Sequence, residues 1–209
     1  MTDYEFTARA ALFAGVVAGS LFFVVPTIEI FRRPNFDIER HAISMLSLGE
    51  GGWIMKVVFI VSGLMTVLCA WGLHQVIGEN LAGFTLPMLI ALYGLGLVLA
   101  GIFDAPAGLG FPAGTPIDQQ PVMTTGATLH SIAFMVAFGA LILSCFAFAW
   151  YFAIHGQLAL AALSAATGLV LPTLIYLGVS STIAPGLAFY WAAMAGWAWF
   201  GVSLLGIRS

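Results

Sequence analysis

The chain has 209 residues, of which 61% are hydrophobic and only 7% are charged, with a formal net charge of -3. A water-soluble domain carries about a quarter charged residues, so this composition and a mean hydropathy of +1.05 exclude that class. No basic block is present, and the sequence therefore predicts no nucleic-acid partner. We predict an all-α, multi-pass membrane protein whose apolar surface meets lipid.

Six apolar runs are each long enough to cross a bilayer, which takes about 20 helical residues. The runs predict a six-transmembrane-helix bundle in a single domain over 1–209, with spans near 7–27, 53–75, 84–103, 127–153, 157–178 and 185–206. Pro26 and the charged segment after it predict the end of the first span. Six spans place both chain ends on one side of the membrane, and they place the loops 28–52, 104–126 and 179–184 on the other, here called the loop side.

Polar residues gather where the first two of these loops join the spans. The segment 40–49 leads into the second span, 103–106 closes the third, and 124–131 opens the fourth. Ionisable groups at membrane depth are costly, which makes them functional hypotheses by default. We therefore expect one polar site on the loop side, formed by Arg40, His41, Ser44, Asp104 and His130.

These residue types are compatible with more than one chemistry. As a binding site, Arg40 and His41 would meet the polar or anionic head of a ligand while the apolar bundle accommodates its tail. As a catalytic site, Ser44 would be the nucleophile, His41 or His130 the base, and Asp104 the group that orients the base. As a metal site, His41, Asp104 and His130 would be the ligands. No spacing signature selects among them, since motifs such as His-Glu-x-x-His and Gly-x-Ser-x-Gly are missing.

Cofactor binding is weakly indicated. Zinc needs at least three protein ligands, and two histidines on separate helix ends make a poor preformed cage, so no stoichiometric zinc is expected. His74 and His155 lie at the opposite membrane face, beside turns. Haem held between helices would need matched histidines deep in the bundle, and haem is not expected.

Several short motifs resemble a known family. They are Arg40-His41-x-x-Ser44 with Leu48-Gly49 and Gly52-Trp53, then Phe103-Asp104 with Pro106, and the stretch from Gly126 to His130. Together they resemble the uncharacterised six-helix membrane family catalogued as domain of unknown function number 998, over about residues 10–205. The resemblance implies a bacterial or archaeal membrane protein, related to the Frag-type membrane proteins, some of which act in lipid remodelling. It implies no agreed activity.

A more distant likeness is to the membrane hydrolases that include alkaline ceramidases. Those enzymes place Ser, Asp and three His around zinc at one membrane face. This chain supplies Ser44, Asp104, His41 and His130, but its last two spans contain no histidine.

The sequence favours the binding of a lipid or another amphipathic small molecule, with membrane lipids as partners, in a prokaryotic plasma membrane. A membrane-embedded hydrolase or transferase acting on lipid-like substrates is the first alternative. A structural or scaffold protein, whose polar cluster only holds the bundle together, is the second.

Overall fold

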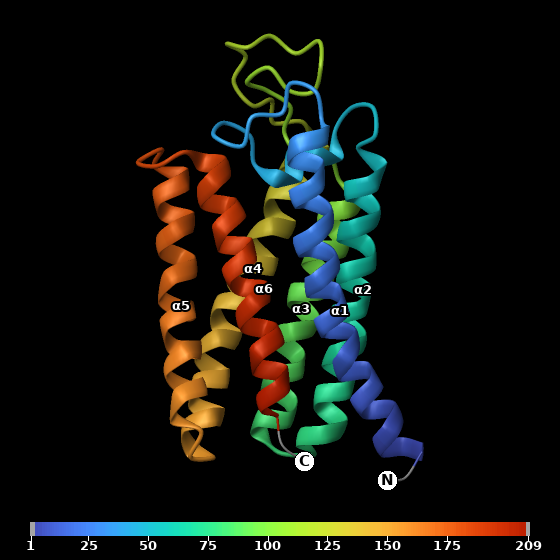
Figure 1. Cartoon of the computed structure of the whole chain (residues 1–209), viewed down its shortest axis with the longest axis vertical. Helices are drawn as coiled ribbons and strands as arrows, with labels where there is room; N and C mark the ends of the chain where they lie inside the picture. Colours follow the sequence, from blue (N-terminus) through green and yellow to red (C-terminus); the bar gives the residue numbers. More distant parts are fainter. Residues whose placement is uncertain (1–2, 208–209) are drawn as a thin grey trace.

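The computed structural model describes residues 3–207, which form six long helices standing side by side in one bundle (Figure 1). The helices are α1 (Asp3–Arg32), α2 (Trp53–Ile77), α3 (Leu81–Ile102), α4 (Thr125–Ile154), α5 (Leu158–Val179) and α6 (Pro185–Gly206). All six are long and apolar enough to span a membrane. This confirms the predicted all-α, multi-pass architecture. Helix α1 begins and α6 ends at the same end of the bundle, as an even number of spans predicts.

The main difference from the predicted spans concerns α1, which continues through Pro26 to Arg32. Proline's fixed φ is compatible with a helix, but it removes one helical hydrogen bond, and its ring crowds the carbonyl four residues earlier. Such losses are tolerated in membrane helices because neighbouring helices restore the packing around the freed carbonyl. As a result, α1 carries Glu29 and Arg32 as helical residues at its loop-side end.

Two helices begin at side-chain caps that fix their first turns. The Asn80 side chain accepts a hydrogen bond from the Gly83 N–H at 3.0 Å, and α3 therefore starts before the predicted position. The Thr124 hydroxyl accepts from the Ala127 N–H at 3.1 Å, which starts α4 directly after the long second loop. Both residues are among the preferred N-caps.

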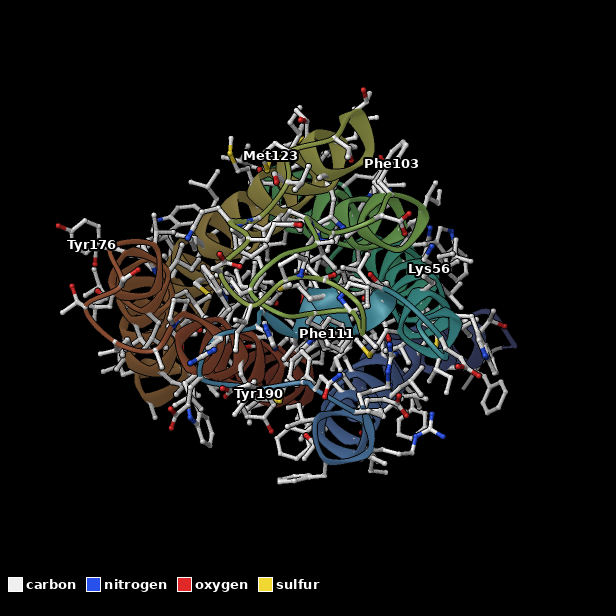
Figure 2. The ribbon with its side chains drawn as sticks, turned by 90° about the horizontal axis from the view of Figure 1, so that it is seen from above. Lys56, Phe103, Phe111, Met123, Tyr176 and Tyr190 are labelled. Atoms are coloured by element: carbon white, nitrogen blue, oxygen red, sulfur yellow. The ribbon has the colours of Figure 1, made fainter. Side chains whose placement is uncertain are left out.

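The helices pack in chain order, and α1 also contacts α6, which closes the arrangement into a ring. Helix α5 is the most peripheral: only 28% of its apolar window is buried, against 56% for α3 and α6. Seen from the loop side, Tyr176 of α5 lies at the outer edge of the molecule (Figure 2). The ring therefore has its best-covered interior between α1, α2, α3, α4 and α6.

A folded cap covers the loop-side end of the bundle. We use "loop cap" for residues 33–52, which include the short 3-10 helix η1 (Ile43–Ser47), together with residues 103–124. The two segments share a small hydrophobic core of Met45, Leu48, Ala105 and Phe111. Phe111 lies over the middle of the bundle (Figure 2). At the opposite end, the described helices are joined by the short turns between α2 and α3 and between α4 and α5.

Candidate functional site

His41 is buried in the loop cap, where it joins the two loops. Its Nδ1 accepts a hydrogen bond from the Asp37 N–H at 2.9 Å, so the proton is on Nε2, which donates to the Leu109 carbonyl at 2.9 Å. The ring lies against Phe36 and Phe111, with centroids 5.3 and 5.4 Å away. Both ring nitrogens are therefore engaged, and this side chain links the loops.

Arg40 and Asp104 lie on the outside of the cap. Arg40 pairs with Asp37 at 3.6 Å, and its side chain is 53% exposed. Asp104 pairs with Lys56 at 2.6 Å, and its side chain is 57% exposed. Each of these predicted site residues thus has its partner in a neighbouring exposed side chain.

His130 is buried in the second turn of α4, and it faces the end of α3. Its Nδ1 lies 3.0 Å from both the Ala100 and the Phe103 carbonyl oxygens. Because both partners are acceptors, Nδ1 carries the proton, and in the neutral imidazole Nε2 then has the free lone pair. The last carbonyls of a helix have no intrahelical partner. His130 therefore provides a hydrogen-bond donor to the two carbonyl oxygens at the end of α3. These carbonyls orient the imidazole, the role that the sequence suggested for Asp104.

A cavity of about 50 Å³ opens next to His130 in the interior of the ring. Its walls are mainly apolar side chains of α1, α2, α3, α4 and α6, and residues 42–44 line it from the loop cap. This volume has room for about three or four water molecules. It is smaller than a typical ligand pocket of roughly 300 Å³ or more, so a larger occupant requires the lining side chains to move.

Three residues lining this cavity have polar atoms without an internal hydrogen-bond partner. They are Ser44 of η1, Tyr93 of α3 and His130 of α4. Over residues 3–207, no side chain or backbone group bonds the Ser44 hydroxyl, the Tyr93 hydroxyl or His130 Nε2. Of the five residues predicted to converge, the structure brings Ser44 and His130 to one cavity and leaves Arg40, His41 and Asp104 in the loop cap.

Half-buried phenylalanine rings form one side of the cavity, where α4 approaches α6. Phe134 contacts Phe138 with ring centroids 4.5 Å apart, and it contacts Phe189 of α6 at 5.8 Å. All three residues line the cavity and are partly exposed. This side of the site is therefore formed by side chains that are not fully buried.

Arg33, which the sequence did not single out, anchors the loop cap. It is 8% exposed and donates from Nη1 to the Leu46 carbonyl at 2.7 Å and from Nη2 to the Leu48 carbonyl. Its guanidinium also lies 5.4 Å from the Phe111 ring centroid. Burial lowers the pKa of Arg33 from its ordinary value, while the negative charge of Glu29 acts in the opposite direction.

The predicted metal ligands do not share a site. Within the described part of the chain, no group of three or more His, Cys, Asp or Glu side chains is placed to hold a metal ion. At the other end of the bundle, His74 bonds the Gly83 carbonyl at 2.7 Å and His155 bonds the Tyr151 carbonyl at 2.7 Å. The expected lack of stoichiometric zinc stays a prediction for elemental analysis.

A family model described as "Protein of unknown function (DUF998)" matches residues 16–206. The chain belongs to the DUF998 family. This confirms the resemblance seen in the sequence motifs, and the match covers all six helices except the first part of α1. No curated protein and no solved structure is found to match this DUF998 member.

The exposed position of Asp104 leads to a prediction for this DUF998 protein. We expect Asp104→Asn to lower the free energy of unfolding by less than about 1 kcal/mol, because exposed ion pairs contribute little. Thermal unfolding in detergent micelles measures this, with Lys56→Met as the matched partner variant. A loss of more than about 2 kcal/mol would show instead that Asp104 belongs to a buried network.

Proposed function

We propose that this protein binds a lipid or another amphipathic small molecule in the bundle cavity, with the polar end of the ligand toward the loop side. The observation that carries the proposal is the pairing of apolar walls with three unpartnered polar groups, on Ser44, Tyr93 and His130. Sites for small molecules combine a mostly apolar lining with a few convergent polar groups. The proposal includes membrane lipids as partners and a prokaryotic plasma membrane as the location.

The polar groups themselves argue against a purely structural role for this cavity. Buried polar groups that only stabilise a fold are hydrogen-bonded within the protein. Arg33 and His41 follow that rule, since each bonds backbone groups of the loop cap. Ser44, Tyr93 and His130 Nε2 have no such partner, and unlike the buried, equally unpartnered Trp197 Nε1 and Ser203 Oγ, they belong to residues that line this cavity. A ligand that supplies the missing hydrogen bonds accounts for the difference.

A hydrolase acting on lipid-like substrates is the second candidate, favoured by the tautomer of His130. An imidazole with its proton held on Nδ1 offers Nε2 as a general base, and Ser44 lines the same cavity. A nucleophile and its base need to be within hydrogen-bond reach. No hydrogen bond joins Ser44 to His130 among the described residues, and we therefore rank binding first.

Filling the cavity tests the binding proposal. Ala193 of α6 is buried and lines the cavity, whereas Ala166 of α5 is exposed. We expect Ala193→Leu to reduce the amount of lipid that co-purifies in mild detergent, measured by native mass spectrometry, by about tenfold or more. The reason is that three added carbon atoms occupy most of the available space.

The control is Ala166→Leu, which makes the same change on the outer surface of α5 and should leave the retained lipid unchanged. Equal retention of lipid by the Ala193→Leu variant and the unaltered protein would refute the cavity as the binding site.

A further inference from the structure

The hydrogen-bonding character of the three polar groups restricts the head of the ligand. His130 Nε2 is an acceptor only, because Nδ1 carries the proton that bonds the Ala100 and Phe103 carbonyls. The hydroxyls of Ser44 and Tyr93 can donate or accept. The complementary head must donate one hydrogen bond to His130 and can accept others from the two hydroxyls. An alcohol can donate through its O–H and accept through its oxygen lone pairs.

The charges around the cavity restrict the head further. Every Lys and Arg of the loop-side end has a partner. Arg32 pairs with Glu29, Arg33 with two carbonyls, Arg40 with Asp37, and Lys56 with Asp104. None of these cations lines the cavity, and neither does any carboxylate, the buried Glu29 included. Burying a charged head without a counter-charge is strongly unfavourable, so the site is suited to an uncharged head.

We infer that the ligand is an uncharged, hydroxyl-bearing amphiphile, such as a long-chain or isoprenoid alcohol, whose hydroxyl donates to His130 Nε2. This rests on the proposed function, and it narrows the ligand class of the same cavity. The sequence had suggested a polar or anionic head held by Arg40 and His41. Both residues have partners within the loop cap, which argues against an anionic head at those positions.

The alcohol should be preferred over its methyl ether by about 10- to 100-fold, since the ether leaves a buried acceptor without a donor. The test is competition against a photoreactive hexadecanol analogue that carries a diazirine, using the purified full chain in micelles of a detergent that has no hydroxyl group and no net charge. The competitors are hexadecanol, hexadecyl methyl ether, palmitate and hexadecyl phosphate. Hexadecanol is expected to compete best.

Substitutions at Ser44, Tyr93 and His130 test whether these polar groups cause the preference for the alcohol over the ether. His130→Phe should abolish the advantage of hexadecanol over its ether. Because His130 also satisfies the end of α3, Ser44→Ala and Tyr93→Phe provide independent tests, each expected to reduce the advantage several-fold. Tyr176→Phe is the matched control for Tyr93→Phe, since Tyr176 is 70% exposed on α5, and it should change nothing.

The possible failures are distinguishable. The inference of an uncharged head group that donates a hydrogen bond is wrong if the ether competes as well as the alcohol, or if palmitate or hexadecyl phosphate competes better. Either result leaves the proposal of lipid binding in the cavity intact. If the photoreactive probe labels none of the cavity-lining residues while Ala193→Leu still reduces lipid retention, the uncharged head is likewise wrong. If Ala193→Leu leaves lipid retention unchanged as well, the proposed function itself fails.

Discussion

Replacing Arg33 with methionine is expected to lower the free energy of unfolding by about 2–4 kcal/mol. Arg33 is buried, and its guanidinium satisfies the Leu46 and Leu48 carbonyls while lying over Phe111. Methionine fills similar space but donates no hydrogen bond, so the two carbonyls lose a charged donor. The shift in the unfolding transition in detergent, followed by circular dichroism, measures the effect.

Arg40→Met is the matched control for Arg33→Met. It removes the same charge from an exposed side chain whose partner is also exposed, and it should cost less than about 1 kcal/mol. If the two variants are equally stable, Arg33 does not anchor the loop cap.

The second large effect is expected from Gly186→Ala, in the first turn of α6. A Cβ at Gly186 would collide with the carbonyl oxygens of Ile38 and His41. Both are backbone atoms, which cannot rotate away, so either α6 or the loop cap must shift. We expect a loss of about 3 kcal/mol or more, seen as a lower unfolding temperature or as poor recovery of folded protein.

Gly201→Ala provides the comparison on the same helix. Nothing lies within 4 Å of a Cβ built at Gly201, and alanine favours a helix over glycine by up to about 1 kcal/mol. This variant should be as stable as the unaltered protein or slightly more so. A tolerated Gly186→Ala would contradict the close contact between α6 and the loop cap.

The sequence was sufficient to predict the six spans, because apolar length alone identifies a membrane helix. It misplaced the end of α1, since Pro26 is a helix breaker in water but is accommodated among packed helices. The starts of α3 and α4 depend on capping by Asn80 and Thr124. Those signals are present in the sequence and could have moved both boundaries.

The candidate site was harder to predict because much of it depends on backbone atoms. The residue types predicted that Asp104 orients a histidine, whereas the Ala100 and Phe103 carbonyls perform that role for His130. Arg33 gave no signal beyond its charge, because its partners are carbonyls of η1 and the residue after it. Tyr93 could have been found, since it is a polar group in the middle of an apolar span.

The link between His41 and Leu109 also has a consequence for the order in which the chain folds. The two residues are 68 positions apart, and both α2 and α3 lie between them. During synthesis, residues 33–52 emerge first, but their contacts with Phe111 and Leu109 cannot form until α3 has entered the membrane. The first loop therefore has to wait, with the Arg33 and His41 side chains uncovered, while two further helices are inserted. Long-range contacts of this kind form late, so the loop cap is completed only when the second loop folds over the ring.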